Sequence, residues 1–190
     1  FNVNIKVITM KKLFTLLFCL SVAGIVSATD VSGSISTNTT WDLAGSPYVV
    51  TGNVTVASGV TLTIDAGVEV KFDNGRSMYA YGDIDATSAT FTSNDGSPVP
   101  GIWNYFEFYS GSNSTLSGCI VEYAYYIEVN DGATLTVDNT STIQSMYYYG
   151  IFNQGTANIT NSTIDLAGYV SNGWGVYANG NSVTNLNNVN

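Results

Sequence analysis

The chain has 190 residues, a formal net charge of -9, five Lys or Arg against fourteen Asp or Glu, and no histidine. So few cations cannot neutralise a phosphate backbone, which excludes nucleic acid as a partner. Without histidine, Ser-His-Asp and Cys-His catalysis and His-ligated zinc are excluded as well. Thr, Ser, Asn and Gly contribute 81 residues, yet hydrophobic residues still make up 45%, enough for a folded core.

The N-terminal segment has the pattern of a secretory leader. A short basic stretch beginning at Met10 precedes an apolar run, 13–26, and Ala28 supplies a small residue at the predicted cleavage site. We therefore interpret 1–9 as upstream read-through and 10–28 as a signal peptide. The apolar run is too short to cross a hydrocarbon core of about 30 Å, so no transmembrane helix is expected. The mature protein is predicted to be secreted or to lie at the cell surface.

Removal of this leader changes the charge and cysteine content. Lys71 and Arg76 remain as the only cations against fourteen acids, which gives a net charge of -12. Such a surface disfavours polyanionic partners unless calcium bridges the charges. Cys119 is then the only cysteine, so no intramolecular disulfide is expected, and we interpret it as a buried small side chain.

From residue 29 onwards the hydrophobic pattern predicts strands. Short alternating segments rich in Val, Ile, Thr and Tyr are separated by Asn-Gly, Asp-Gly and Ser-Gly. Segment 58–65 aligns without a gap on 131–138, and 150–155 aligns on 175–180. Repeats of 20 to 25 residues with three short strands each indicate a coil whose turns stack by parallel pairing about 4.8 Å apart. A jelly-roll or immunoglobulin-like sandwich explains the strands but not the internal match, so it ranks second.

Apolar residues that recur once per repeat are expected to line the core. The first series is Val70, Phe91, Ile120, Ile143, Ile164 and Val189, and the second is Phe106, Ile127, Ile151 and Val176. The long step at 94–102 contains two prolines and is interpreted as a looped-out insertion. Segment 29–50 is predicted to cap the first rung, and 51–190 to form the coil. Further rungs or domains are expected beyond Asn190.

Several segments carry a resemblance to a known group, namely 48–56, 59–72, 82–86 and 116–124. Here the chain resembles secreted bacterial right-handed parallel β-helix proteins of the pectin-lyase-like superfold, over most of the mature sequence. The resemblance implies an all-β fold, a right-handed parallel β-helix of about seven rungs with an N-terminal cap. That superfold includes lyases, hydrolases, adhesins and passive surface stalks, so it indicates the fold more than the activity.

Aromatic and acidic residues flank the second apolar series and are the leading candidates for a site. The predicted carbohydrate-binding residues are Tyr105, Glu107, Tyr126, Glu128, Phe152 and Tyr177. Their four rings are expected to form one outward column beside two carboxylates, with Gly150 and Gly175 also outward. Exposed rings with adjacent acids suit stacking on sugars. The same rings equally suit a ladder that protects the strands, and both interpretations stay open.

Two weaker patterns concern catalysis and calcium. The resemblance implies that a lyase would use Lys or Arg as its base, together with calcium-binding carboxylates, and only Lys71 and Arg76 are available. Asp65 and Asp85 each follow an inward Ile; if they occupy adjacent rungs, they stand about 5 Å apart, and calcium would suit such an oxygen-only site. Solvated outward acids are the simpler interpretation of that pair.

A third pattern, Thr on alternating positions, is one that flat ice-binding faces use. The residues concerned are Thr61, Thr63, Thr90, Thr92, Thr134 and Thr136. Variable repeat lengths and the long insertion argue against a flat array. The sequence as a whole predicts a secreted or cell-surface module for carbohydrate binding, adhesion or a structural stalk, without catalysis and with no cofactor except calcium. A polysaccharide lyase fragment acting on acidic glycans is the alternative, and an ice-binding face ranks third.

Overall fold

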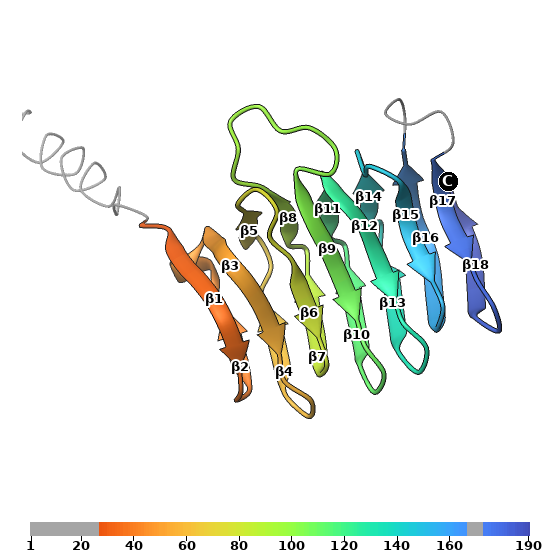
Figure 1. Ribbon diagram of the computed structural model, residues 1–190, viewed down its shortest axis with the longest axis horizontal. Coiled ribbons are helices and arrows are strands. Elements are labelled where there is room, and N and C mark those ends of the chain that lie inside the picture. Colours follow the sequence, from red (N-terminus) through yellow and green to blue (C-terminus); the bar gives the residue numbers. More distant parts are fainter. Residues whose placement is uncertain (1–26, 167–172) are drawn as a thin grey trace, which may run out of the picture.

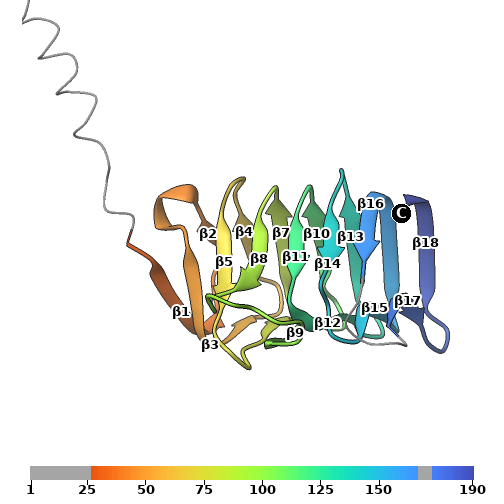
Figure 2. The ribbon, with the colours of Figure 1, turned by 90° about the horizontal axis from the view of Figure 1, so that it is seen from above.

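The protein is an all-β parallel solenoid of about seven turns (Figures 1 and 2). The structure, a computed structural model, describes residues 27–166 and 173–190. It confirms the predicted fold class, a coil whose turns stack in parallel along one axis. The predicted read-through segment 1–9 and nearly all of the predicted signal peptide 10–28 lie outside the described residues.

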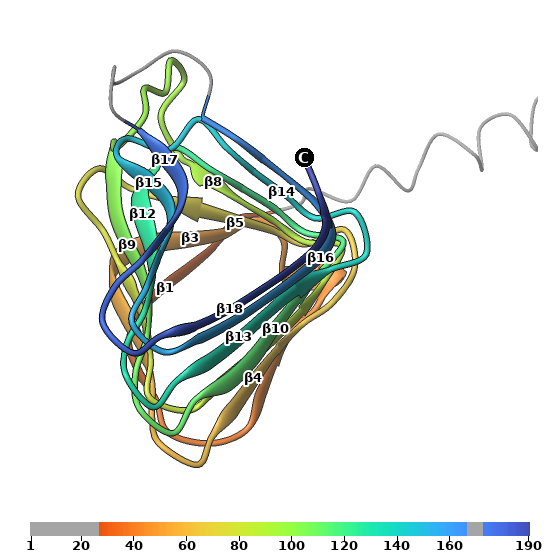
Figure 3. The same ribbon diagram turned by 90° about the vertical axis from the view of Figure 1, so that its right-hand side faces the viewer.

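Each turn contributes strands to three flat sheets that enclose the core, and every strand pair is parallel (Figure 3). Sheet I contains β2 (Thr39–Trp41), β4 (Thr61–Ile64), β7 (Asp83–Thr87), β10 (Asn113–Ser117), β13 (Thr134–Asp138), the first part of β16 (Thr156–Asp165) and β18 (Val183–Val189). Sheet II contains the first halves of β1 (Thr29–Ile35) and β3 (Tyr48–Val56), then β5 (Glu69–Phe72), β8 (Thr90–Ser93), β11 (Ile120–Glu122), β14 (Thr142–Gln144) and the end of β16. Sheet III contains the second halves of β1 and β3, then β6 (Met78–Ala80), β9 (Trp103–Phe108), β12 (Ala124–Val129), β15 (Tyr149–Asn153) and β17 (Trp174–Ala178).

The corner between sheets I and II uses left-handed backbone in successive turns. Positive φ values occur there at Ser88, Gly118, Asn139 and Asn161. Gly and Asn adopt this conformation at the lowest cost, which accounts for part of their abundance in the sequence. The last such corner is reinforced by Asn188, whose amide donates to the side-chain oxygen of Asn161 at 2.8 Å.

Inward side chains of the three sheets form columns that are mostly apolar, with a few buried polar members such as Ser114 and Asn153. The second predicted series is confirmed, because the register pairs Phe106 with Ile127, Ile127 with Ile151, and Ile151 with Val176. Trp103 is fully buried in this core, and its ring nitrogen donates to the backbone oxygen of Glu122 at 2.8 Å. Fully buried columns of this kind provide most of the stabilisation of a solenoid.

The first predicted series is wrong at two of its six members. The register pairs Phe91 with Val121 and Val121 with Ile143, so Val121 points inward while Ile120 is 38% exposed. Because side chains alternate with a period of two, a one-residue shift moves a side chain to the other face. Val189 pairs with Ser162 rather than following Ile164.

The segment 29–50, predicted as a cap, contains β1, β2 and the 3-10 helix η1 (Leu43–Gly45). Its strands pair in parallel with β3 and β4, so the segment itself forms the first turn of the coil. Trp41 and Tyr48 are buried and stack with ring centroids 4.8 Å apart. Cys119 is also buried, as predicted, and burial raises the pKa of its thiol to about 11.

The predicted insertion, 94–102, leaves the coil between β8 and β9, at the corner of sheets II and III (Figures 1 and 3). It is tied back by backbone hydrogen bonds, from Gly75 to Ile102 and from Gly101 to Tyr123. Sheet I lies opposite this corner and its strands pair without interruption. The insertion therefore changes the border of sheet III and leaves sheet I flat.

Candidate functional site

The outward positions of sheet III carry the residues predicted to bind carbohydrate. On β9 and β12 the register pairs Tyr105 with Tyr126 and Glu107 with Glu128, so each pair occupies adjacent turns. Parallel neighbours lie about 4.8 Å apart, which brings two carboxylates and two phenol rings onto one area of the surface. The structure thus assembles four of the six predicted residues into one block.

The other two residues, Phe152 and Tyr177, follow a different column from the predicted one. The register pairs Glu128 with Phe152 and Phe152 with Tyr177, so these rings continue the carboxylate column. The expected single column of four rings is therefore wrong, and two columns run along the face on either side of inward Ile127. The rings of Tyr126 and Phe152 are still neighbours, with centroids 5.9 Å apart. We call the outward surface made by both columns the aromatic face.

Two glycines alter the alternation at the C-terminal end of the aromatic face. Gly150 and Gly175 are predicted to point outward, but both are turned toward the interior. A Cβ atom on Gly150 would lie 2.6 Å from Ile164 Cγ2 and 2.4 Å from the backbone oxygen of Gly175. This backbone path places the ring of Tyr149 outside, 5.8 Å from the ring of Tyr126. Because the glycines have no side chain, the backbone can turn inward at these positions, and the ring of Tyr149 becomes part of the face.

Some rings of the aromatic face cover one another. Tyr149 stacks on Phe152 and on Tyr177, with interplanar angles of 19° and 24°. Phe152 and Tyr177 also stack, with centroids 5.7 Å apart. This part of the face matches the ladder interpretation, because stacked neighbours protect the strands and hide part of each ring.

Other rings are inclined to their neighbours and leave ring surface open. Tyr126 is inclined by 48° to Tyr105 and by 72° to Phe152. At the C-terminal end Trp174 is 52% exposed and is inclined by 59° to Tyr177. The ladder interpretation therefore describes the stacked rings, and stacking on sugars stays a prediction for the inclined ones.

The two carboxylates in the middle of the aromatic face differ in their partners. Glu107 is only 9% exposed and accepts a hydrogen bond from the hydroxyl of Tyr109. Glu128 is half-buried, and within the described ranges no group donates a hydrogen bond to it. Burial, and then the charge of Glu107, raise the pKa of Glu128. Burial and the two acids also raise the pKa of Tyr126, so its phenol stays neutral and can donate.

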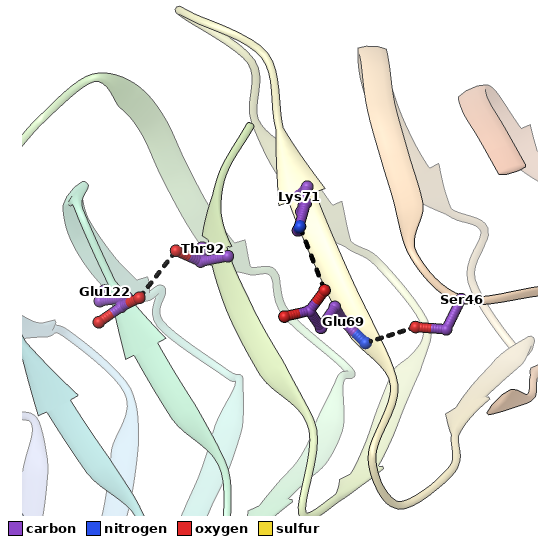
Figure 4. Close-up of polar contacts among 5 residues, drawn as sticks. All are labelled: Ser46, Glu69, Lys71, Thr92 and Glu122. Atoms are coloured by element: carbon purple, nitrogen blue, oxygen red, sulfur yellow. Dashed lines mark hydrogen bonds and ion pairs between the residues drawn. The ribbon is translucent and has the colours of Figure 1, made fainter. Parts of the chain in front are cut away.

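Lys71, one of the two predicted lyase bases, lies on sheet II among polar neighbours (Figure 4). Arg76, the other, borders sheet III, because its backbone oxygen accepts a hydrogen bond from Asn104 of β9. Lys71 points outward from sheet II, and its Nζ forms an ion pair with Glu69 at 3.2 Å. Thr92, on the next turn, donates to Glu122 at 2.8 Å. Arg76 is exposed in the turn before β6. Over 27–166 and 173–190, no group of three or more Asp, Glu, Cys or His side chains is placed to hold a metal ion.

The predicted adjacency of Asp65 and Asp85 is wrong. The register pairs Thr63 with Asp85 and Ile64 with Ala86, so Asp65 lies two positions along the strand from the neighbour of Asp85. Each acid follows an inward Ile, which made the two acids appear equivalent in the sequence. The two Ile residues are not register partners, however, because they are offset by two positions along the paired strands. Asp85 faces Thr63 and Thr115 instead.

The Thr residues considered for ice binding divide between two sheets. Thr90 and Thr92 belong to sheet II, and the other four to sheet I. On sheet I the outward columns keep their register through successive turns, including the turn that carries the insertion. Asp83 and Asp85 occupy positions in the same columns, which interrupts the repetition of Thr.

Compared with known proteins, the chain shows no significant match to a family model, a curated protein or a solved structure. Its class is therefore defined by its own architecture, that of a parallel β-solenoid repeat protein. No helix among the described residues is long and apolar enough to span a membrane.

Three members of the aromatic face were not among the predicted site residues, namely Tyr109, Tyr149 and Trp174. Tyr109 follows the end of β9 and holds Glu107. Tyr149 and Trp174 pair with each other in the register and each precedes a glycine. An aromatic residue followed by Gly and an inward Ile or Val, repeated at one-turn spacing, was the available signal for the last two.

Proposed function

We propose that the aromatic face binds a carbohydrate and that the chain is an exported carbohydrate-binding or adhesive module without catalytic activity. One observation carries the proposal: Glu107 and Glu128 occupy adjacent turns in the middle of a surface of inclined rings. Surfaces that combine large exposed rings with a few fixed acceptors usually have a partner. The export part of the proposal is supported by the predicted signal peptide 10–28.

The chemistry of the face suits sugars in two ways. The flat surfaces of Tyr126 and Trp174 can pack against the C–H bonds of a pyranose ring, which is apolar on its faces. The carboxylate of Glu128 can accept hydrogen bonds from sugar hydroxyls, and such charge-assisted bonds are stronger than neutral ones. Neutral phenols of Tyr105 and Tyr126 add donors, because burial and the nearby acids raise their pKa values.

The non-catalytic assignment rests on where the charged groups lie. Lys71 is held by Glu69 on sheet II and does not face the carboxylates of sheet III. The two carboxylates lie on the outside of a sheet, where water has access to Glu128. A lyase-type site would require a base beside these carboxylates, and Lys71 does not supply one.

A glycan array tests the proposal. We expect the protein to bind at least one glycan class in the presence of EDTA, and the Tyr126→Ala variant to lose at least about tenfold in affinity. Tyr126→Phe keeps the ring and should bind within about threefold of the parent. Binding that is unchanged in Tyr126→Ala would remove the aromatic face from the account.

Catalysis is measured on the same glycans. We expect neither new reducing ends nor the ultraviolet absorbance of unsaturated uronides after prolonged incubation. Release of unsaturated uronides from an acidic glycan would show that the chain is a lyase, and new reducing ends would show hydrolysis. Either result would contradict the non-catalytic part of the proposal.

A further inference from the structure

We infer that the aromatic face selects glycans that carry free amino groups, such as oligomers of deacetylated hexosamine. This inference rests on the proposed function and adds to it the chemical class of the ligand. It is argued from the charges on the face, from the hydrogen-bonding state of Glu128, and from the rings beside it.

The charge of the aromatic face is not compensated by the protein. Glu107 and Glu128 are neighbours in the register, and two carboxylates at that separation repel each other. Within the described ranges the only Lys or Arg residues are Lys71 and Arg76. Lys71 forms the one ion pair found among these residues, with Glu69, so neither cation is paired with the face. A positively charged ligand would therefore meet negative charge that no cation of the protein is paired with.

The two carboxylates are unequal, and Glu128 is the one prepared to receive a donor. Glu107 is already held by the hydroxyl of Tyr109 and is almost wholly buried. Glu128 is half-buried and accepts no hydrogen bond from any described group. The sheet surface removes part of the hydration of this carboxylate, and a ligand that supplies donors can replace the lost hydrogen bonds.

An ammonium group on a sugar meets both requirements at once. It carries three N–H donors and a positive charge, which a hydroxyl lacks. Beside Glu128, the rings of Tyr126 and Phe152 lie within reach of the same ligand, with centroids 5.9 Å apart. Aromatic rings attract cations that lie over their faces, so the rings add to the preference. A uronic acid would instead place a third negative charge against the carboxylate pair.

The test compares three sets of oligomers of equal length on the intact protein: glucosamine, N-acetylglucosamine and galacturonic acid. We expect the glucosamine oligomer to bind at least about fivefold more tightly than its acetylated form, because its amine meets a carboxylate at short range. The galacturonate oligomer should bind more weakly than either. In the Glu128→Gln variant, which keeps the shape of the side chain, the preference for the amine should fall below about twofold.

Two controls separate this preference from general attraction to an acidic protein. Asp85→Asn removes one charge from sheet I and should leave the preference intact. A lysine oligomer of matched charge, which offers ammonium groups but no sugar ring, should lose less affinity in Glu128→Gln than the glucosamine oligomer does. A preference that Asp85→Asn removes as fully as Glu128→Gln would overturn the inference, because the attraction would then be nonspecific.

The outcomes distinguish the inference from the proposed function. Binding of neutral glycans with no gain from amino groups would overturn the inference and leave the carbohydrate-binding proposal standing. Binding of no glycan of any class would overturn both. A gain that depends on Glu128 and not on Asp85 would support both.

Discussion

Sheets I and III belong to the same coil and share its turns, yet their outer surfaces have opposite chemistry. Sheet I presents columns such as Thr63, Asp85, Thr115 and Thr136, which are small or charged and solvated. Sheet III presents the inclined and stacked rings of the aromatic face around a carboxylate pair. Since both sheets pair in parallel through successive turns, pairing alone does not demand rings on the outside.

The difference distinguishes inward residues, which stabilise the coil, from outward residues, which form its surface. Inward positions of both sheets are apolar columns, such as Leu62 with Ile84 in sheet I and Phe106 with Ile127 in sheet III. Outward positions are free to vary, because each turn is stabilised mainly by its core and its ladders. The half-buried rings of sheet III and the exposed Trp174 are not required by the coil, and this is the basis for the proposal that sheet III binds a ligand.

The largest expected effect is the difference in stability between a core variant and a surface variant of sheet III. Phe106 is fully buried between Met78 and Ile127. Phe106→Ala should reduce the free energy of unfolding by about 3–5 kcal/mol, through lost burial and a cavity. Tyr126→Ala, on the outside of the adjacent turn, should cost only about 0.5–1.5 kcal/mol, the usual contribution of a ring–ring contact. Urea unfolding followed by circular dichroism measures both, and equal losses would contradict the separation of core from surface.

A smaller effect tests the glycines that shape the aromatic face. Gly150→Ala should lower the free energy of unfolding by about 1–3 kcal/mol, because its Cβ would overlap Ile164 and the backbone oxygen of Gly175. Gly96→Ala, in the insertion, meets no atom within 4 Å and serves as the matched control. The same urea titration compares them. Equal stability of the two variants would mean that Gly150 is not turned inward.

The next effect depends on pH and concerns the carboxylate pair. Burial and Glu107 raise the pKa of Glu128 in the folded protein, so the folded state holds its proton more tightly than the unfolded state. This contribution to stability is complete below the ordinary Glu pKa of about 4.3 and is lost as the pH rises through the raised value. Glu128→Gln should therefore have a higher melting temperature than the parent at neutral pH, and the gap should narrow on acidification.

A second carboxylate provides the opposite expectation for the same measurement. Both oxygens of Glu122 accept hydrogen bonds, from Thr92 and from Gln144. Glu122→Gln should lower the melting temperature at neutral pH, because an amide cannot accept at both positions. If both variants shift the melting temperature in the same direction, the assignment of Glu128 as the carboxylate without donors fails.

The smallest effect belongs to sheet I. Thr63 is exposed in the middle of an unbroken outward column. Thr63→Ala should change the free energy of unfolding by less than about 0.5 kcal/mol, as is usual for surface positions without special contacts. A loss comparable to that of Tyr126→Ala would mean that the outward columns of the two sheets contribute equally to stability.

The architecture could be predicted from the sequence because the repeat is visible both in the internal matches and in the spacing of the apolar residues. Internal matches, such as 58–65 with 131–138, revealed the period, and the series from Phe106 to Val176 revealed its inward positions. The errors are all of register. Ile120 and Val121 are both apolar and adjacent, so hydrophobicity alone could not decide which of them points inward.

The structure brings the predicted site residues onto one face of sheet III, but in a different arrangement from the predicted one. Tyr105, Tyr126, Glu107 and Glu128 lie side by side, since one register step relates β9 to β12. Between the next two strands Ile127 pairs with Ile151, so Phe152 lies beside Glu128 and belongs to the carboxylate column. The inward turn of Gly150 depends on close approach to Ile164 from sheet II, a contact between sheets that no local pattern contains.

The central claim, that ligand binding belongs to sheet III and not to sheet I, is tested most directly by one titration calorimetry experiment. The best glycan from the array is titrated into two double variants, Tyr105→Ala with Tyr126→Ala on sheet III and Thr134→Ala with Thr136→Ala on sheet I. We predict a loss of at least about tenfold in affinity for the first variant and a change within about twofold for the second. Equal losses, or a loss confined to the sheet I variant, would contradict the account.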